Sequence, residues 1–448
     1  MKKLATLMVS MALFASVLPF AGCADIPEAD PEAGWENQTG TLSILSSNPE
    51  INDVMADIID DFEEQNPGIY VNFEAVPTAN FANLLNTRFQ ANDVDIFALQ
   101  PTSSLGSATN MERNQPLSSD DPEHNFNITD NIQQVYIDEC SYDGVQYIAP
   151  TSVGQNVVFY KKDFMNQYYT ETGKSIPKTW NEFIAFLDYM KAEGKYITYG
   201  GKDLWPFAMI VAPFEATIVR PEIPNLFKEV AVNDFKFAEN EYTQEMFTKL
   251  RQLMQGGYFR PNSAGFEYSA APSSFITDEN AVLTIDGSWS LKQMRDTDAT
   301  VDIGVFNLPG NDDASKNETY SSKVASGWAV GKSSQNKALA KKFLEYFYMD
   351  EVYQYYCDEL YVQSVKDTVT VDDPVIEELA TVPTCITIDN RIVAKMPYDT
   401  YIKETVGPGF LDGSLSVADA LAEIDEKIAA DEPLWGKEVE TFLKKCND

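Results

Sequence analysis

The chain has 448 residues, of which 33 are lysine or arginine and 69 are aspartate or glutamate, so its formal net charge is −36. At roughly 150 residues per domain, this length predicts two or three domains. Binding of nucleic acids, anionic membranes or polyanionic ligands by bulk charge needs clustered lysine and arginine, so the acidity argues against all three. His124 is the only histidine, which excludes any site that needs two of them.

The N-terminus has the pattern of a secretory signal. Two lysines precede an apolar stretch at 4–20 that is too short for a comfortable membrane span. Cys23 follows Ala-Gly and resembles the acylated cysteine of a lipoprotein, with an ordinary signal and a nearby cysteine as the alternative. We expect a lipoprotein signal peptide at 1–22 and a lipid-anchored flexible tether at 23–40, because that segment is polar, acidic and rich in proline.

Four further cysteines occur without any CxxC motif, so zinc and thioredoxin-type sites have no support. Disulfides are compatible with a location outside the cytoplasm, and free buried thiols are equally compatible with the sequence. The pairing among these residues stays open: Cys140, Cys357, Cys385 and Cys446.

Strands and helices alternate after the tether. The expected elements are a strand at 41–47, a helix at 48–65, a strand at 69–75, a helix at 81–91 and a strand at 94–99. This alternation predicts parallel βαβ units. Ligands of such sheets lie beyond the carboxyl ends of the strands, which makes Asn48 and Gln100 candidate site residues.

A second α/β region begins near residues 147–160. Thr179 and Glu182 fit a capping box that opens a helix, and a Gly-Gly pair at 256–257 ends another. Later elements are expected as strands at 281–285, 301–306 and 324–330, and as helices at 335–348 and 417–430.

Five segments, in order, resemble the extracellular solute-binding proteins of carbohydrate ABC importers, a family that includes the maltose-binding protein. The segments are YDGVQYIAP with VVFYKK (142–150 and 157–162), TWNEF (179–183), AVLTIDGSW (281–289), ASGWAVG with KALAKKFLEYF (325–331 and 337–347), and GSLSVADALA (413–422).

The resemblance implies an α/β fold of the two-lobed periplasmic-binding-protein type, with a ligand cleft between the lobes and hinge closure. Lobe 1 would be 41–152 with 318–368, and lobe 2 would be 153–317 with 369–448. The implied function is a lipid-anchored extracytoplasmic receptor, not an enzyme, that captures a carbohydrate, most simply an oligosaccharide, and delivers it to ABC permease subunits. The resemblance implies a monomer without metal or cofactor.

Aromatic planes bury the apolar face of a sugar, while polar side chains bond its hydroxyl rim. On this basis and by resemblance, the candidate ligand-binding residues are Trp289, Asp286, Trp328, Trp205, Asn48, Gln100, Gln155 and Tyr401. Each has a structural alternative, as a core residue or a turn former. Gly154 occupies the position at which the maltose-binding relative places an acidic contact, so that contact is not expected here.

Two other functions stay open. One is a glycan hydrolase that uses two carboxylates, although no nucleophile or phosphate-binding motif is complete: the chain has no GxSxG and no GxGxxG. The other is a surface glycan-capture lipoprotein that shares the fold but is not coupled to transport.

Overall fold

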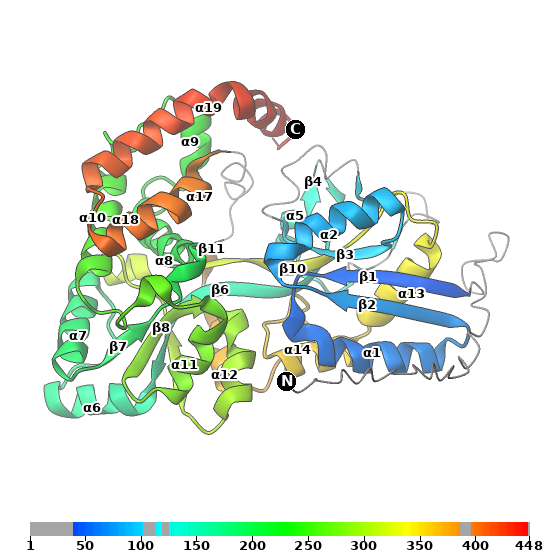
Figure 1. The fold of residues 1–448 in the computed structure, drawn as a ribbon, viewed down its shortest axis with the longest axis horizontal. Helices are drawn as coiled ribbons and strands as arrows, with labels where there is room; N and C mark the ends of the chain where they lie inside the picture. Colours follow the sequence, from blue (N-terminus) through cyan, green and yellow to red (C-terminus); the bar gives the residue numbers. More distant parts are fainter. Residues whose placement is uncertain are drawn as a thin grey trace, which may run out of the picture.

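The structure is a computed structural model that describes residues 39–101, 113–118, 125–126, 128, 130–142, 144–385 and 396–446. Two α/β lobes lie beside each other along its long axis (Figure 1). The predicted signal peptide, Cys23, most of the predicted tether and His124 lie outside the described residues.

A single large sheet runs through both lobes. Its strand order is β2-β1-β3-β10-β6-β8-β7, with β9 paired to β6 and β11 paired to β10, while β4 and β5 form a separate pair. The strands are β1 (Gly40–Ser46), β2 (Ile69–Ala75), β3 (Ile96–Leu99), β4 (Ser141–Tyr142), β5 (Val145–Gln146), β6 (Ala149–Lys161), β7 (Tyr196–Thr198), β8 (Ala281–Gly287), β9 (Ile303–Phe306), β10 (Tyr320–Val330) and β11 (Thr384–Cys385). β1 pairs in parallel with both β2 and β3, which confirms the predicted βαβ start.

Helices cover both halves of the sheet (Figure 1). They are α1 (Asn52–Gln65), α2 (Thr78–Ala91), α5 (Gln134–Glu139), α6 (Lys162–Thr172), α7 (Trp180–Ala192), α8 (Phe207–Phe214), α9 (Leu226–Val232), α10 (Glu241–Gln255), α11 (Ala271–Thr277), α12 (Leu291–Asp298), α13 (Lys337–Phe347), α14 (Asp350–Leu360), α15 (Pro374–Thr381), α17 (Tyr398–Tyr401), α18 (Gly407–Asp412) and α19 (Val417–Cys446). No helix in the described part of the chain is both long and apolar enough to cross a membrane.

Two predicted helix starts differ in detail from the structure. The helix expected from residue 48 begins as a short 3-10 turn at Pro49–Ile51, and α1 follows it. At α7 the Thr179 hydroxyl accepts from the Glu182 amide at 3.3 Å, as a capping box requires. The Glu182 carboxylate, however, accepts from the Lys178 amide at 2.8 Å instead of the Thr179 amide, so the reciprocal half of the box is displaced by one residue.

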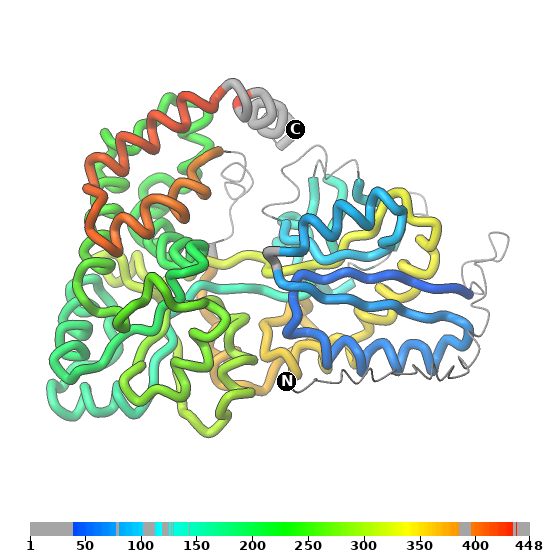
Figure 2. Tube along the Cα trace, in the orientation of Figure 1, coloured from blue at the N-terminus to red at the C-terminus, as the bar shows by residue number. Residues whose placement is uncertain are grey.

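β6 and β10 join the two lobes. The first half of β6 pairs antiparallel with β10, and its second half pairs antiparallel with β8 and β9. The far end of β10 pairs with β3 of the first lobe. Both strands therefore belong to the two lobes at once, as the ribbon and the tube show (Figures 1 and 2). The predicted boundary at 152/153 falls within β6, and the lobe boundaries remain a prediction.

Each lobe has its own hydrophobic cluster. The first draws on β1, β3, α1, α13 and α14, and it continues across the joining strands to buried residues of α11, α12 and β9. The second draws on α7, α8, α10 and α18, and Trp180 lies within it. Because the first cluster crosses the junction, the lobes share apolar contacts at the joining strands as well as backbone hydrogen bonds.

Candidate ligand-binding site

Trp289 lies where β8 of the second lobe ends, directly against the joining strand β6. A Cβ atom built on Gly154 of β6 would lie 3.0 Å from Cε3 of the indole, and one built on Gly287 would lie 2.1 Å from its Cζ2. Both glycines therefore make room for the half-buried ring. The lack of a side chain at residue 154, noted in the sequence, has a steric reason: an acidic side chain there would collide with Trp289.

A hydrogen-bond network fixes the orientation of this indole. Its Nε1 donates to the Tyr268 hydroxyl at 2.9 Å, and that hydroxyl donates to Asp286 Oδ1 at 2.9 Å. The Tyr268 hydroxyl also lies 2.9 Å from Ser290 Oγ. Asp286 is 1% exposed and accepts from the Gly287 amide at 2.7 Å. Asp286 therefore acts through Tyr268 and Trp289 from beneath the surface.

Burial dominates the ionisation of Asp286. Removal from water raises the pKa of its carboxyl to about 6, against the opposing hydrogen bonds from Ser290, Gly287 and Tyr268. In this buried position the carboxyl accepts the hydrogen bond from the Tyr268 hydroxyl and so holds that hydroxyl in place.

Trp205 completes an aromatic surface. Its ring meets that of Tyr268 edge-on, with centroids 4.4 Å apart and planes at 65°. Trp205 is 36% exposed. We call Trp205, Tyr268 and Trp289 the aromatic wall; it offers apolar ring surface, while the Tyr268 hydroxyl and the Trp289 N–H are bonded within the network described above.

A lysine of the second joining strand lies beside this wall. Lys323 of β10 stands opposite Gly154 in the strand register, and its Nζ lies 5.7 Å from the centroid of the Trp289 ring. Burial lowers the pKa of Lys323, and the charge of Lys403 acts in the same direction, while Glu139 and Asp399 oppose them. Neither Lys323 nor Tyr268 was among the residues predicted from the sequence.

The two predicted residues of the first lobe lie at one edge of the sheet. Asn48 follows β1 and Gln100 follows β3, and these strands are parallel neighbours, so both follow carboxyl ends at the same edge. Gln100 is exposed. Asn48 makes turn contacts: its amide donates to Ser46 Oγ at 3.1 Å, and its Oδ1 accepts from Ser47 Oγ at 2.9 Å.

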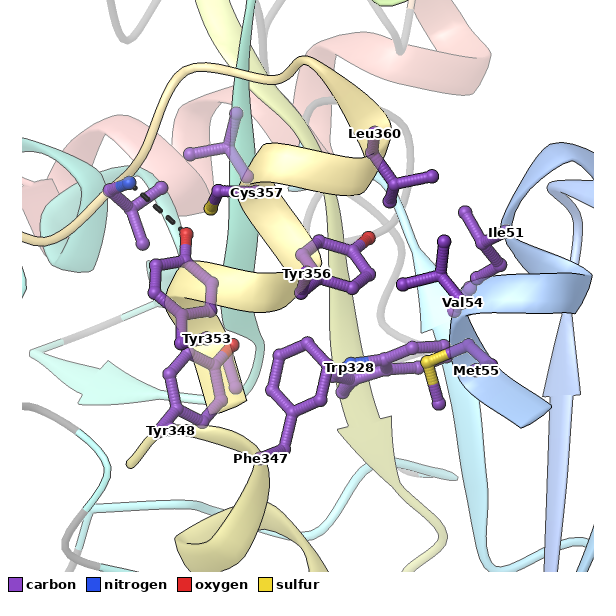
Figure 3. Close-up of a cluster of buried hydrophobic side chains, with 14 of the residues drawn as sticks. Ile51, Val54, Met55, Trp328, Phe347, Tyr348, Tyr353, Tyr356, Cys357 and Leu360 are labelled. Carbon is purple, nitrogen blue, oxygen red and sulfur yellow. Dashed lines mark hydrogen bonds between the residues drawn. The ribbon is translucent and has the colours of Figure 1, made fainter. Parts of the chain in front are cut away.

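Besides Asp286, three further predicted ligand residues are buried. Trp328 is 2% exposed in the first core, where its ring meets Phe347 edge-on at 6.2 Å and lies beside Met55 (Figure 3). Gln155 is fully buried, and its Nε2 donates to the Leu379 carbonyl at 3.2 Å. Tyr401 is 4% exposed and donates to Glu423 Oε2 at 2.5 Å. In this structure their rings and polar atoms contact other parts of the protein, and their role in ligand binding remains a prediction.

Comparison with known proteins now identifies the family. Residues 48–354 match the sequence profile of the bacterial extracellular solute-binding proteins. The chain belongs to this family.

Named relatives agree with this assignment. The multiple sugar-binding protein of Streptococcus mutans is 24% identical over 339 residues, which cover 71% of this chain and 73% of that protein. Among solved structures, the solute-binding protein RafE in complex with raffinose superposes with a TM-score of 0.72 at 20% identity, over 87% of this chain and 99% of that one. A chitin oligosaccharide binding protein gives a TM-score of 0.70 at 20% identity, over 87% of this chain and 98% of that one. The predicted two-lobed α/β fold is confirmed.

Within the described ranges no group of three or more histidine, cysteine, aspartate or glutamate residues could hold a metal ion. Cys357 is a buried free thiol, and Cys140 is also buried. Signals for the missed residues were weak: Tyr268 belongs to no motif, and Lys323 lies one residue before the strand predicted at 324–330.

Proposed function

We propose that this protein captures a carbohydrate, most simply an oligosaccharide, on the aromatic wall and delivers it to an ABC permease. The observation that carries the proposal is the wall itself: Trp205, Tyr268 and Trp289 meet beside the strands that join the lobes. The sugar ligands named for the relatives support it.

The physical basis is the two-sided character of a sugar. Its C–H face gains by leaving water against an aromatic ring, and its hydroxyl groups keep their hydrogen bonds with polar groups around the ring. Trp289 would stack on the sugar, and Asp286 would keep that indole in place through Tyr268. Asn48 and Gln100 would contact the ligand from the first lobe after closure about the joining strands.

The membrane arrangement is also a proposal. Cys23 would carry the lipid anchor, and the folded part would work outside the cytoplasm as a monomer, with lobe 1 at 41–152 and 318–368 and lobe 2 at 153–317 and 369–448. Replacing Cys23 by serine should move the protein from the membrane fraction to the soluble fraction. Retention in the membrane fraction would contradict the anchor.

Binding is tested by thermal shift and calorimetry on residues 24–448 with mono-, di- and oligosaccharides, amino acids and peptides. Ligand at 100 times its dissociation constant stabilises the folded state by about 2.7 kcal/mol. Trp289→Ala should weaken binding of the sugar by about 1–3 kcal/mol without unfolding the protein. Tyr169→Ala is the matched control, because Tyr169 is an aromatic residue of α6 that is 60% exposed.

The outcomes separate the competing functions. Unchanged affinity in Trp289→Ala would reject the stacking role, and ligands confined to peptides would reject the carbohydrate class. Cleavage of the sugar during the measurement would indicate a hydrolase. Tight binding of long glycans, with sugar uptake unaffected by deletion of the gene, would indicate a glycan-capture lipoprotein.

A further inference from the structure

The ammonium group of Lys323 lies beside the aromatic wall. Its nearest recorded contact is the Trp289 ring, 5.7 Å from centroid to Nζ, which is close to the outer limit of a cation–π interaction. Among the residues that the structure describes, none forms a hydrogen bond or an ion pair with this ammonium. The side chain is half-buried, and its ammonium carries three N–H donors.

The charged groups around Lys323 are engaged elsewhere. Asp399 forms an ion pair with Lys403 at 2.5 Å, one turn along the same helical segment. Glu139 of α5 reaches the same strand but accepts from the Val324 amide at 2.9 Å. Lys403 adds positive charge close to Lys323. Lys323 is therefore a partly desolvated cation whose neighbouring carboxylates are bonded to other groups.

Such a cation is costly unless something pairs with it. A hydroxyl group can accept a hydrogen bond from an ammonium but does not neutralise its charge. A carboxylate does both, and charge-assisted hydrogen bonds are roughly twice as strong as neutral ones. A lysine side chain is also long and flexible, so its ammonium can reach a carboxylate at the edge of a sugar ring that stacks on Trp289.

We propose that Lys323 is a specificity-determining residue that selects a sugar carrying a carboxylate, so that the bound oligosaccharide contains a uronic acid unit at the Trp289 position. This inference rests on the proposed function and names the ligand class of the same site. It requires one acidic unit and not a polyanion, consistent with a net charge of −36 that disfavours highly charged ligands. The net negative charge of the protein repels a carboxylate over long range, but physiological salt largely screens this repulsion. The contact between the carboxylate and Lys323 is short-range and is screened much less.

The test is calorimetry with matched pairs of oligosaccharides that differ only by oxidation at C6. A suitable pair is cellobiouronic acid with cellobiose, which differ by a single carboxylate, and cellobiose sulfated at one C6 separates carboxylate from sulfate recognition. The variants are Lys323→Met, which keeps the apolar stem, and Lys323→Arg, which keeps the charge. Lys174→Met is the control, because Lys174 is exposed just after α6 at the outer end of the second lobe (Figure 1).

We expect the wild-type protein to bind the acidic member of a pair about 10- to 100-fold more tightly than the neutral one. Lys323→Met should abolish that preference while changing affinity for the neutral sugar by less than about 3-fold, and Lys323→Arg should retain most of it. Lys174→Met should retain the full preference. Circular dichroism and the melting temperature show whether each variant is folded.

Each other outcome overturns the inference. Equal or tighter binding of the neutral sugars would reject the acidic ligand and leave the proposed function intact. An equal loss of affinity for neutral and acidic sugars in Lys323→Met would show that Lys323 donates hydrogen bonds to sugar hydroxyl groups without selecting a carboxylate. A preference for the sulfated sugar over the uronate would replace carboxylate by sulfate recognition. Failure of every sugar to bind would reject the proposed function itself.

Discussion

Asp286 should make the stability of this protein depend on pH. The side chain is 1% exposed, and burial raises the pKa of its carboxyl from 3.8 to about 6. Because the pKa is higher in the folded state, this group stabilises the fold fully below about pH 4, and the contribution is lost as the pH rises through about 6. A shift of this size corresponds to about 3 kcal/mol of unfolding free energy between pH 4 and pH 7.

The perturbation is Asp286→Asn, which keeps the shape and an acceptor for Tyr268 but cannot ionise. The unfolding free energy of the variant relative to the wild type should rise by about 3 kcal/mol from pH 4 to pH 7. Urea denaturation at four pH values measures it, with the linear extrapolation slope checked for constancy. Asp60→Asn, an exposed position on α1, is the control and should show no such trend. If the difference in unfolding free energy between Asp286→Asn and the wild type does not change with pH, the argument that burial raises the pKa of Asp286 is refuted.

Three further outcomes are expected. Gly154→Ala places a methyl group 3.0 Å from Trp289. The tryptophan fluorescence should therefore change, and ligand affinity should fall by roughly 1–3 kcal/mol. An unchanged spectrum and an unchanged affinity would contradict this contact. Arg295 and Asp373 form a buried ion pair at 2.9 Å, so removing either side chain alone should cost about 3–5 kcal/mol in urea denaturation, and removing both should cost less than the sum. Burial raises the pKa of the Cys357 thiol, so it should react with a disulfide reagent only after unfolding; rapid labelling of the native protein would disagree.

Short-range patterns predicted most of the individual elements. The strand at 69–75 was predicted to the residue, because alternating apolar and polar positions between turn signals need only neighbours in the chain. The strand expected at 324–330 begins earlier, at Tyr320, and irregular register near Val324 and Ser326 interrupts its pairing with β6. The residues after this irregularity, Gly327 to Val330, are all buried, so both faces of this end of β10 are covered and a linear pattern did not reveal that Trp328 is buried.

The family and the βαβ start could be inferred from the chain alone, because motifs and periodicity are properties of nearby residues, whereas the ligand role of Trp289 remains a prediction. The site itself could not. Gly154, Tyr268, Trp289 and Lys323 come from separate parts of the chain and meet only because β6 and β10 pair across the two lobes. Burial is likewise a property of the packed whole, so only the tertiary structure separates Asp286 beneath the wall from Trp205 at its surface.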